Sequence, residues 1–170
     1  MASIVRRKRI ARSSRACCFV LAVLLIAGEA VSKTLQVVNA DGHTSTITAA
    51  QIAGAPHVTV RVNDHDAAAE FEGVPLSAIL SMAGIRLGDT MRGPRMTEVL
   101  LVEAADDYKV AFALAEVDPA FATRAIILAD KRDGKALDAK QGPYRIVAPG
   151  DKRPARWVRE VTALRVVRVK

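Results

Sequence analysis

The sequence is poor in the residues that most often carry nucleophilic and redox chemistry. Its 170 residues include two cysteines, three histidines, one tryptophan and two tyrosines. Both cysteines, Cys17 and Cys18, lie within the first thirty residues, so the chain from Val31 onward contains no thiol. That part of the chain therefore has no disulfide, no thiolate nucleophile and no cysteine-ligated metal.

The common catalytic and nucleotide-binding motifs are also missing. The chain has no glycine-rich phosphate loop and no His-Glu-x-x-His metal helix. Nothing in it indicates a Ser-His-acid arrangement. His43, His57 and His65 lie without close ligand spacing, so solvated or hydrogen-bonded histidines are favoured over a metal site.

Residues 1–30 have the layout of a secretory signal peptide. A basic leader precedes the apolar run from Ala16 to Ala27, which is too short for an ordinary membrane span. Gly28-Glu29-Ala30 supplies the small residues of a cleavage site after Ala30. We therefore predict a periplasmic protein exported by a cleaved signal peptide, with an uncleaved anchor as the alternative. The Arg6-Arg7 pair leaves both the twin-arginine and the general secretion route open.

Charge is distributed unevenly along the chain. It has 25 Lys and Arg against 18 Asp and Glu, but six of these cations and one of the acids belong to residues 1–30. The remainder has a net charge of +2, and a nucleic-acid partner is not expected. Residues 31–130 carry six more acidic than basic side chains, whereas residues 131–170 carry eight more basic than acidic ones. This segregation predicts a local anionic partner near the C-terminal segment.

Short alternating segments predict a domain with more strand than helix. Strands are expected at Thr34–Val38, Thr44–Thr48, Val58–Val62, Glu98–Ala104, Tyr108–Leu114, Ala125–Ala129, Tyr144–Val147 and Val161–Val169. A hairpin turn is expected at Asn39–Gly42. One helix is expected to begin at Pro75 and to end before Gly84, and a weaker one to span Ala115 to Phe121. Residues 31–170 are thus predicted to form one α+β domain.

Two loops carry candidate binding residues. Asp106-Asp107-Tyr108 lies between two predicted strands, either as a tight turn or as a loop that presents a carboxylate and a phenol to a heterocyclic ligand. The second loop follows Pro149-Gly150 and gathers cations around the tryptophan, in a sequence suited to an anion or to the edge of a ring. Trp157 itself is either a stacking surface or a core anchor.

Four segments, taken in order, carry a resemblance to a known family. They read FEGVPLSAIL followed by AGI, VEAADDYKVAF, AIILADKRDGKAL and GPYRIVAPGDKRPARWV, and they fall within residues 58–169. Together they resemble the oxidoreductase molybdopterin-binding domain, and the last segment is the most specific. The resemblance implies the sulfite-oxidase fold, a single domain of mixed β-sheet with few helices.

The chain departs from the enzymes of that family at one position. Those enzymes hold a pterin-dithiolene molybdenum cofactor, which is ligated by a cysteine from an early strand-loop. Here Asn63, Asp64 and His65 stand roughly where that cysteine is expected, so a molybdenum–thiolate site is excluded. The chain is similar to small exported members without the cysteine. That similarity implies a non-catalytic pterin-binding protein, a sensor or accessory for an inner-membrane signalling protein that controls cyclic-di-GMP.

The resemblance and the loops together give a candidate pterin site without molybdenum. Carboxylates suit the donors of the aminopyrimidinone edge, arginines suit its acceptors, and Trp157 or Tyr108 suits stacking. The residues expected to line the site are Asn63, Asp64, His65, Asp106, Asp107, Tyr108, Arg145, Lys152, Arg153, Arg156 and Trp157. Two alternatives stay open: a molybdopterin-dependent oxidoreductase subunit with a non-cysteine metal site, and a protein-interaction module without a ligand.

Overall fold

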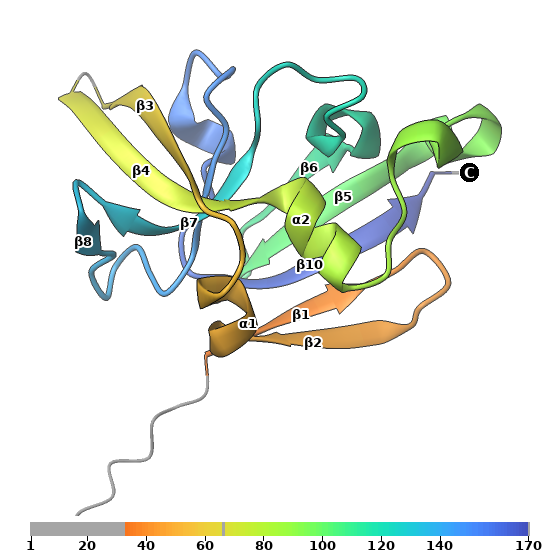
Figure 1. Ribbon diagram of the computed structural model, residues 1–170, viewed down its shortest axis with the longest axis horizontal. Helices are drawn as coiled ribbons and strands as arrows, with labels where there is room; N and C mark the ends of the chain where they lie inside the picture. The colour runs from red at the N-terminus through yellow and green to blue at the C-terminus, as the bar shows by residue number, and fades with distance from the viewer. Residues whose placement is uncertain (1–32, 66, 170) are drawn as a thin grey trace, which may run out of the picture. The chain divides into compact units, whose positions relative to one another are not determined.

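The computed structural model describes residues 33–65 and 67–169, so the predicted signal peptide lies outside the described residues. Strands dominate this part of the chain (Figure 1). They are β1 Thr34–Val38, β2 Thr44–Thr48, β3 Val58–Asp64, β4 Ala67–Pro75, β5 Glu98–Ala104, β6 Lys109–Ala113, β7 Ile127–Arg132, β8 Lys135–Ala136, β9 Arg145–Val147 and β10 Val161–Arg168. The α-helices among the described residues are α1 Ala49–Ala53 and α2 Leu76–Met82. The predicted α+β class is confirmed.

The first sheet has the strand order β2-β1-β10-β5-β6. β1 and β10 pair in parallel, with Val37 opposite Leu164, and the other pairs are antiparallel. Residues of β5 alternate between fully and partly buried positions, as expected for a sheet with one face on the core. The predicted strands of this sheet are confirmed, with ends that differ by a residue or less.

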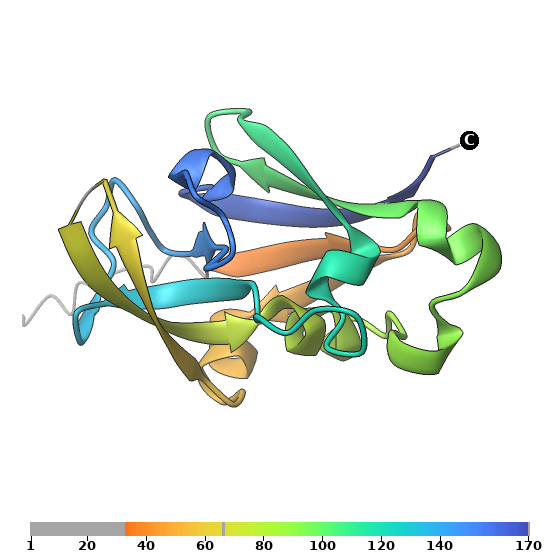
Figure 2. The same cartoon turned by 90° about the horizontal axis from the view of Figure 1, so that it is seen from above.

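The second sheet has the strand order β3-β4-β7-β8. β9 also pairs with β7, along residues 127–129, whereas β8 pairs with residues 131 and 132. β3 and β4 form a long hairpin that projects away from the first sheet in both ribbon views (Figure 2). β4 was not predicted, because the run Ala67-Ala68-Ala69 has little intrinsic preference for a strand. Pairing with β3 on one edge and β7 on the other fixes it instead.

The predicted helix is confirmed, and the weaker second one is wrong. Leu76, Ile79 and Leu80 of α2 are fully buried, and Gly84 follows the helix at φ +78°, which glycine adopts without strain. In place of the second helix, the chain forms a short 3-10 helix, η3 Leu114–Val117. It ends at Asp118 because the following proline disfavours a helical conformation there.

The two sheets share one hydrophobic core. Phe71 and Leu128 of the second sheet and Leu100 and Phe112 of the first are fully buried in the same cluster. Among the described residues, no helix is long and apolar enough to cross a membrane. The candidate site lies between the end of β3 and the C-terminal segment.

Candidate functional site

A pocket of about 720 Å³ lies between the hairpin tip, the loop after β5, the loop before β9 and the segment before β10. It lies within the range of ordinary small-molecule sites. Its lining residues are Asp64, His65, Ala104, Asp106, Tyr108, Arg132, Ala139, Lys140, Gln141, Arg145, Pro154, Ala155, Trp157, Val158, Arg159 and Glu160.

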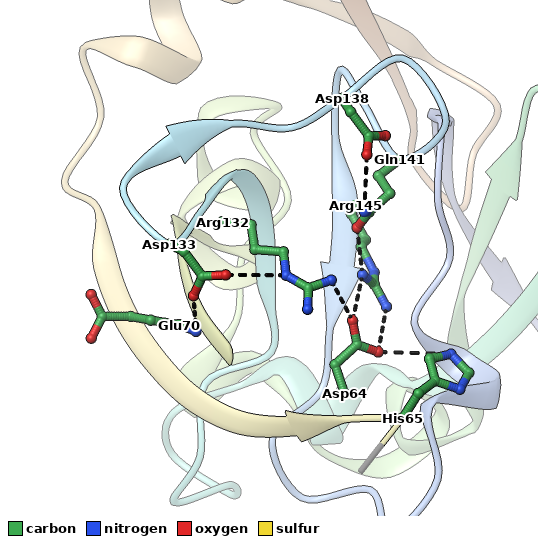
Figure 3. Close-up of polar contacts among 8 residues, drawn as sticks. All are labelled: Asp64, His65, Glu70, Arg132, Asp133, Asp138, Gln141 and Arg145. Carbon is green, nitrogen blue, oxygen red and sulfur yellow. Dashed lines mark hydrogen bonds and ion pairs between the residues drawn. The ribbon is translucent and has the colours of Figure 1, made fainter. Parts of the chain in front are cut away.

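The floor of the pocket is a buried carboxylate held by two arginines (Figure 3). Arg145 Nη1 and Nη2 donate to Asp64 Oδ2 and Oδ1 at 3.0 and 3.1 Å, which is a two-pronged pairing. Arg132 Nη1 donates to the same Oδ2 at 3.0 Å. The side chains of Asp64 and Arg145 are only 3 % and 5 % exposed. Both oxygens of Asp64 are therefore used inside the protein.

Arg145 is also packed between aromatic rings. Its guanidinium carbon lies 5.0 Å from the centre of the Phe71 ring and 5.7 Å from the centre of the Trp157 ring. Gln141 Oε1 accepts a further hydrogen bond from Arg145 at 2.7 Å, whereas Arg145 Nε is buried without a partner among the described residues. Cation–π contacts of this desolvated kind add to the ion pair. The terminal nitrogens and the ring contacts thus hold the guanidinium of Arg145 in place.

The lowered pKa of Asp64 predicts that the folded protein loses stability in acid. Burial raises the pKa of its carboxyl, but the hydrogen bond and charge of Arg145 and the charges of Arg132 and His65 outweigh burial, so the pKa lies below the ordinary 3.8. A carboxyl with a depressed folded-state pKa contributes stability above its unfolded-state pKa. That stability is lost as the pH falls from there through the folded-state value.

We therefore expect the unfolding free energy of the wild type to fall more steeply with acidification than that of Asp64→Asn. The variant starts from a lower stability at neutral pH because it lacks the charge that both arginines face. Urea unfolding between about pH 6 and pH 2 measures both slopes. Parallel curves would show that Asp64 does not titrate with folding.

The rim of the pocket is exposed and carries groups of both signs. Tyr108 is 49 % exposed, and its hydroxyl donates to Ala155 O at 2.8 Å. Asp106 Oδ1 accepts from the Tyr108 backbone N–H at 3.1 Å. Within the part of the chain that the structure describes, Lys140, Arg159, Asp106 and Glu160 make no ion pair. These four charged side chains are therefore available to pair with a ligand.

Glu160 is held in an unusual backbone conformation. Its φ is +51°, which costs energy for a residue other than glycine. Two backbone hydrogen bonds fix it: its N–H donates to Gln141 O at 3.1 Å, and its carbonyl accepts from Ala105 N at 3.0 Å. Glu160 thereby joins the loop before β9 to the loop after β5 along one side of the pocket.

Six of the predicted site residues are brought together in this pocket. They are Asp64, His65, Asp106, Tyr108, Arg145 and Trp157. Trp157 is the core anchor rather than an open stacking face. It is 5 % exposed, its ring N–H donates to Ala148 O at 3.1 Å, and it meets the Phe71 ring edge-on at 6.3 Å. Tyr108 is the exposed ring of the pocket.

The other five predicted residues lie outside the pocket. Asn63 is exposed next to Asp64 because successive side chains of a strand point to opposite faces. Asp107 is exposed at a turn position with φ +65°, and Lys152 and Arg153 are also exposed. Their expected ligand contacts therefore have no support from this pocket.

Arg156 has a different set of partners. It donates to both oxygens of Asp151, at 3.0 and 2.6 Å, and to Glu116 Oε2 at 3.1 Å. Its guanidinium lies 4.4 Å from the centre of the Phe112 ring. Arg156 is the last residue of the 3-10 helix η4 Pro154–Arg156, and its ion pair with Glu116 joins η4 to η3.

Sequence reasoning missed several residues of the pocket. Arg132, Lys140, Gln141, Arg159 and Glu160 line it, and none of them was predicted. Three of them, Arg132, Lys140 and Arg159, belong to the basic excess of residues 131–170. The charge of a segment does not show which of its cations line a common pocket. Arg132 reaches the site because β7 places it beside the hairpin, opposite Phe71.

The pocket offers hydrogen-bonding groups and an exposed ring that suit a pterin. No cysteine, and so no thiolate ligand, occurs among the described residues. Nor do residues 33–65 and 67–169 contain a group of three or more His, Cys, Asp or Glu side chains placed to hold a metal ion. The rim, in contrast, offers unpaired cations, carboxylates and an exposed ring to a flat polar heterocycle.

The two sheets, with this pocket at their junction, define a sulfite-oxidase-like molybdopterin-binding domain. A family model, the oxidoreductase molybdopterin binding domain, matches residues 38–169. The chain belongs to that family, as the four sequence segments predicted.

A crystal structure of the sulfane dehydrogenase SoxCD from Paracoccus pantotrophus is similar, with a TM-score of 0.62 and 21 % identity. The match covers 79 % of this chain and 38 % of that chain, so this chain spans well under half of its neighbour. No match was found among curated proteins.

Proposed function

We propose that this protein binds a reduced pterin in the pocket and does not catalyse a reaction. The observation that carries the proposal is the composition of the pocket. It combines an exposed aromatic ring with unpaired charges of both signs, in a fold whose family binds a pterin cofactor, while its lining contains no thiolate. Stacking and hydrogen bonding to the organic part of the cofactor do not require a metal ligand.

Each residue of the rim suits a different part of a pterin. Tyr108 offers a flat face for stacking on the bicyclic ring. Asp106 and Glu160 accept hydrogen bonds, which suits the amino and ring N–H donors of the aminopyrimidinone edge. Lys140 and Arg159 donate, which suits the ring carbonyl or an anionic tail. Asp64, which was expected to bind the donor edge, is already occupied by the two arginines.

Calorimetry on residues 31–170 with a panel of reduced pterins tests the proposal. Saturable binding of at least one reduced pterin is expected, with a change in the fluorescence of Trp157, the chain's one tryptophan, which lines the pocket. Failure to bind any member of the panel would sink the proposal.

The exposed aromatic residues allow a matched comparison of variants. Tyr108→Ala is expected to weaken pterin binding by about tenfold or more, since stacking on an aromatic side chain contributes on the order of 1–3 kcal/mol. Phe121→Ala removes an aromatic side chain of similar exposure, 52 %, which lines a different pocket, and should leave the affinity unchanged. Equal affinities for both variants in the calorimeter would rule out stacking on Tyr108.

The setting of the activity is also a proposal. The leader of residues 1–30 supports export and cleavage after Ala30, and mass spectrometry of the periplasmic protein should find Val31 as its first residue. The resemblance to small exported members supports a role as sensor or accessory for an inner-membrane protein that controls cyclic-di-GMP. Crosslinking in whole cells, with and without added pterin, should capture that membrane partner; recovery of no membrane protein would contradict this role.

A further inference from the structure

The paired charges at the pocket floor have the form of an occupied anion site. Two guanidinium groups, from β7 and β9, converge on one carboxylate from the end of β3 (Figure 3). Arg145 approaches it with both terminal nitrogens, which is the geometry in which arginine recognises a planar oxyanion. Strands that are distant in sequence thus build a receptor for an anion and fill it with a side chain of the same protein.

Arg132 and Arg145 also contact polar residues other than Asp64. Arg132 Nε contacts Asp133 at 3.4 Å, and Asp133 accepts from the Glu70 backbone N–H at 2.9 Å. On the other side, Gln141 holds Arg145 and contacts Asp138 at 3.4 Å. Both arginines therefore have polar partners besides Asp64, so we expect the anion site to keep its form when the carboxylate is removed.

We propose that Asp64 is a specificity-determining residue whose carboxylate permanently fills the anion site of Arg132 and Arg145 and so excludes small oxyanions from the floor of the pocket. An external anion would have to displace a carboxylate that is 3 % exposed and tethered to the same chain. Ligand recognition then falls to the unpaired charges of the rim. This inference concerns the same pocket but does not depend on which ligand the rim takes.

Chemical rescue tests the proposal without any pterin. Asp64→Ala vacates a space the size of a carboxylate between the two arginines, and formate has that size and charge. We expect Asp64→Ala to melt below the wild type in chloride and its Tm to rise with formate concentration, as for any ligand that binds only the folded state. The wild type should show no difference between formate and chloride at equal ionic strength.

Two control variants separate site occupancy from loss of charge. Asp64→Asn also loses the charge but keeps the space filled, so formate should not raise its Tm. Asp89→Asn removes one charge at an exposed position of the 3-10 helix η1 Gly88–Thr90, outside the pocket, and should behave as the wild type. If Asp64→Ala does not fold in chloride, its refolding yield in formate against chloride gives the same measurement.

Each result decides the proposal. Rescue of Asp64→Ala alone supports it. An equal response of Asp64→Ala and wild type to formate, or recovery of the variant in neither salt, overturns it. A failure of pterin binding in the separate calorimetric panel would leave the formate result standing, so the proposed function and this inference fail independently.

Discussion

Arg145→Ala is expected to lower the free energy of unfolding by about 3–5 kcal/mol, the range for breaking a buried ion pair by removing one partner. The substitution leaves Asp64 buried with Arg132 as its remaining arginine partner. It also removes the guanidinium that lies between the Phe71 and Trp157 rings. Urea unfolding, followed by Trp157 fluorescence, measures the loss.

Arg132→Ala is the matched control for this prediction. Arg132 also pairs with Asp64, but through one hydrogen bond and from a side chain that is 30 % exposed. Its removal should cost much less than that of Arg145, because solvent partly screens a charge that is not fully buried. If both variants lose the same stability, burial and the two-pronged geometry are not what makes Arg145 important.

Gly73→Ala is expected to have the second large effect, about 3 kcal/mol or more. A Cβ at Gly73 would overlap the carbonyl of Leu128 and the Cα of Ala129 in β7. These are backbone atoms of a paired strand, so they do not move aside as a flexible side chain would. The register of β4 against β7 shifts between Glu72 and Gly73, which brings the two backbones close at this point.

Gly150→Ala is the control for Gly73→Ala. An added Cβ there meets nothing within 4 Å, so its stability should change by no more than about 0.5 kcal/mol. Thermal unfolding of both variants checks the contrast. A Gly73→Ala variant that melts with the wild type would show that β4 and β7 separate at little cost.

The class of fold could be predicted from the sequence because its evidence is local. Strand-forming runs such as Glu98–Ala104 and the helix stop at Gly84 are properties of short segments, and the structure confirms them. β4 was missed because its alanines become a strand only through pairing with β3 and β7. The helix expected at Ala115–Phe121 was wrong because Pro119 cuts it short.

The site could be predicted only in part, for a similar reason. The segments of Asp64, Tyr108 and Arg145 were identified, yet the sequence does not show that Asp64 and Arg145 pair across 81 positions. A strand period places Asp64 inward and Asn63 outward only once the buried face is known. The cations after Pro149 were the most conspicuous in the sequence, but Arg156 forms ion pairs with Asp151 and Glu116. Arg132, which was not among the predicted site residues, is the one that reaches the pocket floor.

We propose that the pocket holds a pterin without a catalytic molybdenum centre. The most direct measurement is made on protein isolated from the organism that produces it: mass spectrometry of the small molecule released on unfolding, together with elemental analysis for molybdenum. We predict a released pterin and molybdenum far below one atom per chain. Molybdenum at one atom per chain would overturn this proposal and identify the protein as an oxidoreductase subunit with an unusual metal site.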